Sequence, residues 1–199
     1  MPKSDKLSLT TFVDFVLKAG TPKLTVVRNF KNRPEYDPAI DFYKPLRDEI
    51  LRMHANGEPK KALDAFLGIA YAKKRVQYAA VIAGYQKYLG KKVVTWFDPP
   101  SDVWTARGIT VSVNPELGLQ IGGVPYVIKL YFKGDKLAKN RMEIINHLMA
   151  STLGDPKKPR TFGVLDMRNA KLHTAATDPG LAALLQGEAA SFAAMLGAV

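Results

Sequence analysis

Residues 109–133 read ITVSVNPELGLQIGGVPYVIKLYFK, and this stretch decides the fold. Two runs rich in β-branched and aromatic residues flank Gly122-Gly123, and two such runs joined by two glycines predict a β-hairpin with a tight turn. A two-residue turn fixes which residues face each other across the strands. The predicted pairs are Ile121 with Val124, Leu119 with Tyr126, Leu117 with Ile128, Pro115 with Leu130, and Val113 with Phe132.

The same register divides the hairpin into two faces. The pairs above are nearly all apolar, whereas the other face places Glu116 opposite Lys129 and Ser112 opposite Lys133. We therefore expect one face to lie in the core and the other face to be polar. Opposite charges that face each other across two strands usually form a surface ion pair, so Glu116 and Lys129 are expected to form a cross-strand salt bridge.

Working outward, apolar residues at spacings of three and four indicate helices before the hairpin, and strand-like runs surround it. The expected elements are a short helix ended by Gly20 and Pro22, an extended run at 24–27, helices over 37–57 and 59–90, strands at 93–97 and 103–107, a helix capped by Asp135, a strand at 162–168, and a last helix from Asp178-Pro179. The second long helix either runs on to Gly90 or restarts near Lys73. Residues 169–174 either fold back as a hairpin or leave the sheet.

This order predicts an α+β fold (α/β in a loose sense), in which a mixed sheet of about four or five strands is flanked by helices. We expect a single domain over residues 1–199. It would comprise a helical N-terminal segment (1–71), an α/β core (72–177) and a C-terminal helix (178–199). That last helix carries one charge, Glu188. It should therefore be buried in the core or form the subunit contact of a homo-oligomer.

Composition narrows the classes of function. The net charge of +11 favours a polyanionic partner, DNA or RNA, although a basic surface can serve solubility alone. The absence of cysteine excludes disulfides and thiolate metal sites and fits a reducing compartment. The N-terminus lacks the apolar run of a signal peptide, and no stretch is expected to span a bilayer, so we expect a cytoplasmic protein with no membrane partner.

The stretch from Asn114 to Lys133, followed by a helix and then FGVLD, resembles the core of the PD-(D/E)XK (restriction-endonuclease-like) nuclease superfamily. The resemblance covers about half of the chain and rests on element order and hairpin spacing. It implies a restriction-endonuclease-like core. It also implies phosphodiester hydrolysis with a divalent metal, Mg²⁺ or Mn²⁺, held by strand carboxylates.

Carried over by position, Pro115-Glu116 matches the Pro-Asp of the family, and YVIKLY (126–131) matches the strand that bears the acidic-x-Lys triplet. Lys129 then occupies the acidic position and Tyr131 the lysine position, or Ile128 and Leu130 after a slip of one residue. Neither register supplies a second carboxylate. The resemblance therefore implies a divergent, catalytically degenerate relative.

Three functions stay open. The first is nucleic-acid binding without catalysis. The second is an active Mg²⁺-dependent nuclease in which Glu116 is the metal ligand, Lys129 or Lys133 supports the attacking water, and a helix-borne acid such as Glu49 or Asp64 completes the site. The third is a non-enzymatic interaction or assembly protein that uses the apolar C-terminal helix.

Other residues offer weaker signals. The candidate phosphate contacts are Lys73, Lys74, Arg75, Lys157, Lys158 and Arg160, which are otherwise solvated charges. Trp96, Trp104, Tyr126 and Tyr131 either stack on bases or belong to the core. Asp166 is a partner for Arg168 or Lys171, or a third acid. His147 and Glu143 are expected to form a solvated pair on the outer face of their helix.

Overall fold

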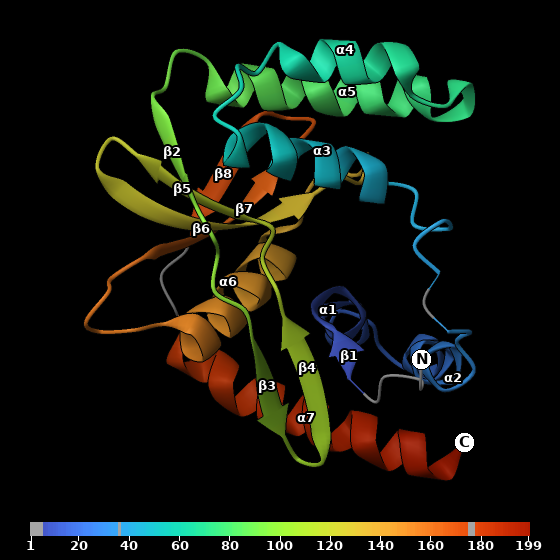
Figure 1. Cartoon of the computed structure of the whole chain (residues 1–199). Helices are drawn as coiled ribbons and strands as arrows, with labels where there is room; N and C mark the ends of the chain where they lie inside the picture. The colour runs from blue at the N-terminus through green and yellow to red at the C-terminus, as the bar shows by residue number, and fades with distance from the viewer. Residues whose placement is uncertain (1–5, 36, 175–177) are drawn as a thin grey trace.

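In the part of the chain that the structure describes, two mixed sheets, one of three strands and one of five, form the centre and are flanked by seven helices (Figure 1). The computed structural model describes residues 6–35, 37–174 and 178–199. Within these ranges the α+β prediction is confirmed. Strands follow the order β1-β4-β3 in the small sheet and β2-β5-β6-β7-β8 in the large one.

One long, bent hairpin contributes to both sheets. Its first arm is β2 (Val94–Phe97) followed by β3 (Asp102–Ala106), and its second arm is β4 (Ile109–Val113) followed by β5 (Leu117–Ile121). β2 pairs with β5 and β3 pairs with β4 in one continuous register. The arms bend where prolines interrupt both of them, at Pro99-Pro100 and at Pro115, because proline has no N–H for the ladder.

The hairpin read from the sequence is formed by β5 and β6 (Val124–Tyr131), and its first three predicted pairs, from Ile121–Val124 to Leu117–Ile128, are confirmed. Gly122 and Gly123 have φ of 57° and 83°, as the tight turn requires. The predicted pairs of Pro115 with Leu130 and Val113 with Phe132 are wrong. β4 leaves β6 at Pro115 and pairs instead with β3 and the short strand β1 (Leu7–Ser8).

The face of the hairpin that was expected to be polar also contains buried apolar residues and is covered by a helix. β7 (Thr161–Asp166) lies parallel to β6, and the connection between them is α6 (Lys139–Leu153), which covers the lower face of the sheet (Figure 1). Val127 and Val164 on that face are fully buried. β8 (Lys171–Thr174) folds back on β7 as a hairpin, which is one of the two expected alternatives.

The upper face of the large sheet is covered by α3 (Lys44–Ala55), α4 (Ala62–Ile69) and α5 (Ala72–Leu89) (Figure 1). α5 restarts after α4 and does not continue it. It approaches the sheet closely at Gly84, where an added Cβ would lie 2.0 Å from the carbonyl oxygen of Met167. The core of this layer includes Ile50, Tyr85, Leu117 and Leu165.

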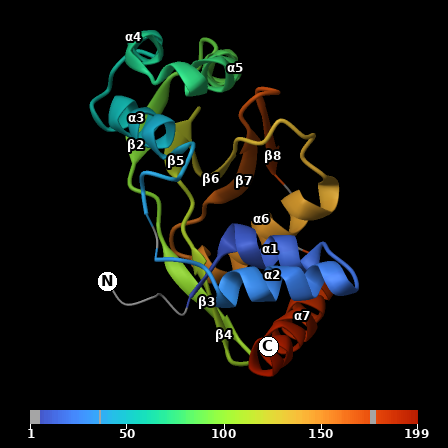
Figure 2. The ribbon, with the colours of Figure 1, turned by 90° about the vertical axis from the view of Figure 1, so that its right-hand side faces the viewer.

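A second hydrophobic cluster lies below. It joins β3, β4 and α6 to α1 (Leu9–Val16), α2 (Thr21–Lys31) and α7 (Pro179–Ala198). Figure 2 shows α1 and α2 next to each other with α7 below them, in agreement with their contacts. The helices of residues 1–71 are therefore divided between the two clusters.

Several helix boundaries differ from expectation. α3 begins at Lys44 and not at 37–38, after turns over residues 38–43. α2 replaces the extended run expected at 24–27 and begins next to Pro22. Pro22 opens this helix because the first turn has no intrahelical N–H bond for proline to remove. The N-cap of α6 is Ala138 and not Asp135, although Leu137 before the helix is buried as expected.

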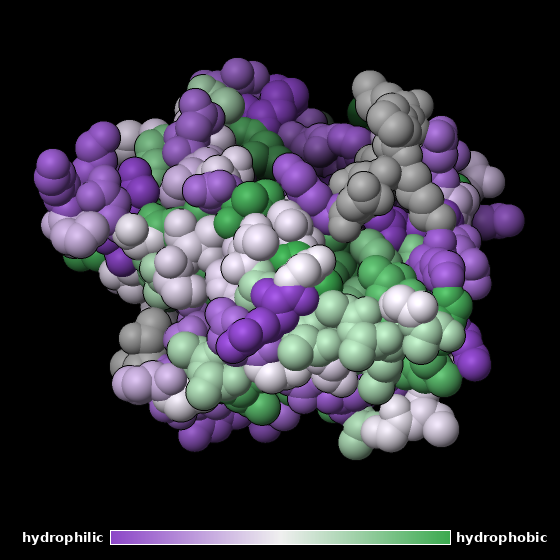
Figure 3. Space-filling model, turned by 90° about the horizontal axis from the view of Figure 1, so that it is seen from below, coloured by the Kyte–Doolittle hydropathy of each residue, from purple (hydrophilic) through white to green (hydrophobic). Residues whose placement is uncertain are grey.

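α7 begins as predicted, with the Asp178 side chain accepting the Gly180 N–H at 2.8 Å and Pro179 at the first position. The expectation that it is mostly buried is wrong, because only Leu185, Ala189 and Phe192 are buried. Figure 3 shows this lower side of the molecule, on which hydrophobic and weakly hydrophobic residues spread across the middle. By length and composition α7 also meets the criteria for a membrane span, although no such stretch was expected. Its buried residues belong to the lower core.

Candidate functional site

Glu116 lies directly before β5, where the second arm of the bent hairpin turns away from β6. Its Oε1 accepts a hydrogen bond from Lys129 Nζ at 2.6 Å, and its Oε2 accepts one from the Leu130 backbone N–H at 2.8 Å. Lys129 Nζ also donates to the carbonyl of Asn114 at 3.2 Å. The predicted cross-strand ion pair is therefore present, and both oxygens of this carboxylate are engaged.

This geometry does not fit a metal ligand. A divalent cation for phosphoryl chemistry needs free carboxylate oxygens, and here the Lys129 ammonium stands within 2.6 Å of one of them. Both side chains are largely withdrawn from water, with 13% and 11% of the Lys129 and Glu116 side chains exposed. The pair closes the position at which the resemblance would place the metal.

A cleft of about 360 Å³ opens beside this pair, and we call it the Glu116 cleft. Its charged lining residues are Asp41, Arg47, Glu116, Lys129, Lys133 and Arg141. Leu130, Phe132 and Val164 contribute an apolar wall. The cleft thus gathers more cations than acids on an apolar base.

Ion pairs neutralise most of these charges. Arg47 Nη2 lies 2.9 Å from Asp41 Oδ2, and Arg141 Nη2 lies 2.6 Å from Asp14 Oδ1. Burial pushes the pKa of Asp41 up, but the hydrogen bond and charge of Arg47 outweigh it and hold that pKa below its usual value. Lys133, the other predicted catalytic lysine, is half exposed at 4.0 Å from Asp14.

The acids proposed to complete a metal site lie elsewhere. Glu49 forms an ion pair with Arg52 at 2.7 Å, and Asp64 accepts a hydrogen bond from Gln86 at 2.9 Å. Asp166 is buried, and its two oxygens accept the N–H groups of Asn169 at 3.1 and 2.9 Å, so its partner is neither Arg168 nor Lys171. No group of three or more potential metal-binding side chains occurs among the residues that the structure describes.

The six predicted phosphate contacts form two separate groups. Lys73, Lys74 and Arg75 begin α5, whereas Lys157, Lys158 and Arg160 precede β7 at the opposite end of the sheet (Figure 1). Arg75 also has a structural role, because its guanidinium donates to the carbonyls of Ala70 and Gly68 at the end of α4. Lys74 lies over the ring of Phe42, 5.2 Å from its centroid.

A larger group of cations, not singled out in the sequence, surrounds the other end of α5. We call it the lysine cluster: Lys60, Lys61, Lys87, Lys91 and Lys92. Lys60 Nζ donates to the carbonyl of Gly90 at 2.6 Å, and Lys92 donates to that of Tyr88. Lysines that cap a helix C-terminus are stabilised by its dipole, but their positions in sequence are too scattered to show as a run.

An exposed face of α5 connects the two ends. Lys73, Val76, Ala80, Ala83 and Lys87 recur at spacings of three and four and are all exposed, and we call this face the α5 stripe. α5 also carries Lys74, Arg75, Gln77 and Gln86, and it contains no Asp or Glu in its 18 residues. The residues of α5 itself therefore present cations and no acid, and the nearest acid established on its flank is the exposed Asp64 of α4, which accepts a hydrogen bond from Gln86.

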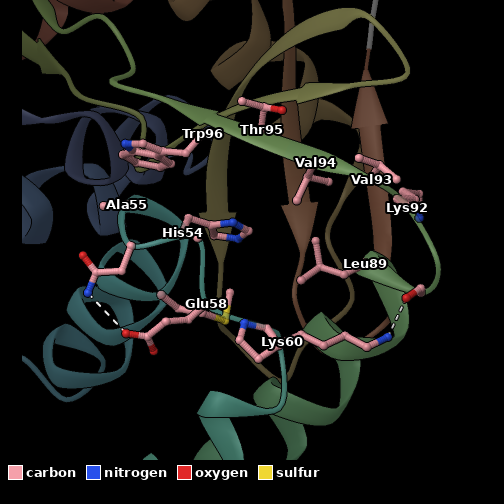
Figure 4. A pocket seen from close by; sticks show the side chains of 15 residues that line it. His54, Ala55, Glu58, Lys60, Leu89, Lys92, Val93, Val94, Thr95 and Trp96 are labelled. Carbon is pink, nitrogen blue, oxygen red and sulfur yellow. Dashed lines mark hydrogen bonds between the residues drawn. The ribbon is translucent and has the colours of Figure 1, made fainter.

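Beside the lysine cluster lies a pocket of about 640 Å³ between α3, the end of α5 and β2 (Figure 4). His54 and Trp96 line it, and their rings are nearly parallel at 12° with centroids 6.3 Å apart. The other candidate tryptophan, Trp104, packs on Phe12 in the lower core.

The expectation that His147 is solvated is wrong, since it is only 8% exposed and burial lowers its pKa.

Comparison of the chain with models of known protein families, with curated proteins and with solved structures found no match in any of the three.

Proposed function

We propose that this protein binds the phosphate backbone of nucleic acid along α5 and does not hydrolyse it. The observation that carries the proposal is the α5 stripe, an acid-free exposed helix face with Lys73 at one end and Lys87 at the other. Phosphate contacts by lysine release counterions and supply most sequence-independent affinity. The cytoplasmic location expected from the sequence is part of the same proposal.

The lysine cluster extends this surface beyond the helix. Lys87 belongs to both, Lys91 and Lys92 follow Gly90, and Lys60 and Lys61 lie in the α3–α4 connection, so a strand leaving the stripe at Lys87 meets Lys91 and Lys92 next. Lys157, Lys158 and Arg160 lie toward the same end of the sheet, because β7 begins opposite Tyr126, near the Gly122-Gly123 turn. They are proposed as further contacts for a longer strand.

The engaged state of Glu116 supports binding without hydrolysis. Both of its oxygens are hydrogen-bonded, so a metal would have to displace Lys129 and leave the Leu130 N–H unpaired. We interpret the chain as a divergent PD-(D/E)XK-like protein in which the ion pair has replaced the metal. If the chain is instead an active nuclease with a migrated site, an oligonucleotide probe incubated with it should be cleaved.

The test is fluorescence anisotropy of a labelled single-stranded oligonucleotide over a salt series. Replacing Lys73→Gln and Lys87→Gln should weaken binding and reduce the slope of log affinity against log salt by about 1.4, since each phosphate contact on a single strand contributes about 0.7. The matched control is Lys18→Gln with Lys139→Gln, two exposed lysines distant in sequence from α5. Equal slopes for the two double variants would contradict the proposal.

A second candidate function is assembly with another copy of the chain through α7. The observation that favours it is a set of small residues on the exposed side of this helix, Ala183, Gly187, Ala190, Ala194 and Gly197, at spacings of four and three. A helix face that stays in water normally carries charged residues, and this one carries none.

A further inference from the structure

The pocket beside the lysine cluster combines an aromatic platform with apolar and cationic walls (Figure 4). The Trp96 indole is half-buried and lies nearly parallel to the His54 ring, so the two rings face in the same direction. Leu89 and Val94 line the pocket between the platform and Lys92. Its volume of about 640 Å³ falls within the range of small-molecule sites.

The platform is held rigid from behind. His54 Nε2 lies 2.5 Å from the hydroxyl of Tyr85, which is fully buried in the upper core. Burial raises the pKa of this phenol well above its usual value, so Tyr85 keeps its proton and can donate it to His54. Burial also lowers the pKa of His54 to about 4, which keeps the imidazole neutral at physiological pH. A neutral ring of fixed orientation suits stacking better than a mobile cation.

Cations stand at one end of the same pocket. Lys60 and Lys92 line it, and each has its ammonium fixed on a carbonyl near the end of α5. Lys91 is exposed next to them. Glu58, the one acid in the lining, accepts hydrogen bonds from Arg52 at both of its oxygens, and Arg52 also pairs with Glu49, so these three groups together carry one negative charge. Lys60, Lys91 and Lys92 outweigh it, so the net charge at this end of the pocket is positive.

We propose that this pocket binds an unpaired nucleobase stacked on Trp96, with the adjoining phosphates at Lys91 and Lys92. Base–aromatic stacking beside a cationic groove is the general mode by which proteins hold single strands, since every base offers a π-face. The inference rests on the proposed function and adds to it a preference for single-stranded over duplex nucleic acid. The α5 stripe alone carries no such preference, because a duplex presents the same phosphates.

The test uses two labelled probes of about 15 nucleotides, oligo(dT) and an abasic oligonucleotide with the same backbone. The parent protein should bind oligo(dT) more tightly, and Trp96→Ala should weaken that binding roughly 5- to 100-fold while leaving the abasic probe unaffected. Trp96→Phe should retain most of the affinity. The matched control is Tyr71→Ala, an aromatic residue 66% exposed at the other end of α5, which should change neither affinity.

Each outcome separates this inference from the proposed function. If the parent binds both probes equally, the proposed nucleobase site is contradicted and binding to the backbone still stands. This comparison uses the parent protein alone, so it does not depend on whether a variant folds. If Trp96→Ala weakens both probes to the same extent, Trp96 supports the surface without stacking and the nucleobase site is again wrong. If neither probe binds, both proposals fail together.

Discussion

The carboxylate of Glu116 shows how strongly a side chain's neighbours decide its chemistry. Its position and its partner Lys129 could be predicted, because a two-residue turn fixes the register of the hairpin. The second hydrogen bond, from the Leu130 N–H, could not be predicted. It exists because the chain turns away from β6 at Pro115, which leaves that N–H without a partner in the ladder. The spacing of residues in the sequence does not predict where a strand turns away from its neighbour.

The burial and the partners of His54 could not be predicted from the sequence. A single histidine in a helical pattern gives no indication of its burial, and only the packing of α3 on β2 places it against Tyr85 and Trp96. Trp96 and Trp104 were both candidates for stacking on bases, but nothing in the sequence showed that Trp96 lies at a pocket and Trp104 in the core.

Acid should destabilise the fold through His54. Its pKa is about 4 in the folded protein and about 6.5 when unfolded, so the unfolded chain binds more protons between these values. Stability is therefore fully present above about pH 6.5 and falls as the pH decreases toward 4. Urea unfolding at pH 7 and pH 4.5 should show a loss of roughly 2–3 kcal/mol, and His54→Gln should reduce this loss.

His173→Gln is the matched control, because His173 is less buried and its pKa is also lowered by burial. It should remove a smaller part of the acid-induced loss than His54→Gln does. If parent and His54→Gln lose the same stability between the two pH values, His54 is not the buried neutral histidine described above.

Helices and turns were predicted correctly where residues close together in the sequence determine them. The Gly-Gly turn, the restart of α5 and the cap of α7 by Asp178 follow from residues within a few positions of each other. The extended run expected at 24–27 failed because its β-branched residues lie after a proline that favours the start of a helix. Packing against α1 and α7 then decided for the helix.

α7 was expected to be buried because it carries a single charge, yet most of it is exposed. We predict that the exposed small residues hold a second copy of the chain. Light scattering after size-exclusion chromatography should find an oligomer for the parent, and Ala190→Glu should convert it to a monomer that keeps the far-UV circular dichroism of the folded parent.

Ala65→Glu, which places the same charge on an exposed position of α4, should leave the oligomer intact. A parent protein that is monomeric at every concentration would contradict assembly through α7. Truncation of the helix is a poorer test, because it also removes Phe192 from the lower core.

For the whole molecule, net charge indicated a polyanionic partner but not where it binds. The ion pairs of the Glu116 cleft contribute no net charge, whereas the described structure shows no ion pair for the lysines of α5 and its C-terminal end. Two of the predicted groups, at 73–75 and 157–160, lie at different ends of the sheet. The lysine cluster that lies beyond the α5 stripe comes from three separate parts of the chain, and only folding brings them together.

The central claim, that nucleic acid lies along α5 without being cleaved, is tested most directly by probe length. α5 has 18 residues and is about 27 Å long, so roughly eight nucleotides follow it at about 3.4 Å each. Anisotropy would be measured at low salt with Mn²⁺ present, for labelled single strands of about 4, 8, 12 and 20 nucleotides. Each probe would be examined on a gel afterwards.

We predict that affinity rises steeply up to about 8–12 nucleotides and then levels off, that Lys73→Gln with Lys74→Gln weakens the longer probes and not the shortest, and that every probe stays intact. Binding at no length would contradict the nucleic-acid account and leave assembly through α7. A cleaved probe would contradict the closed state of Glu116 and restore an active metal-dependent nuclease.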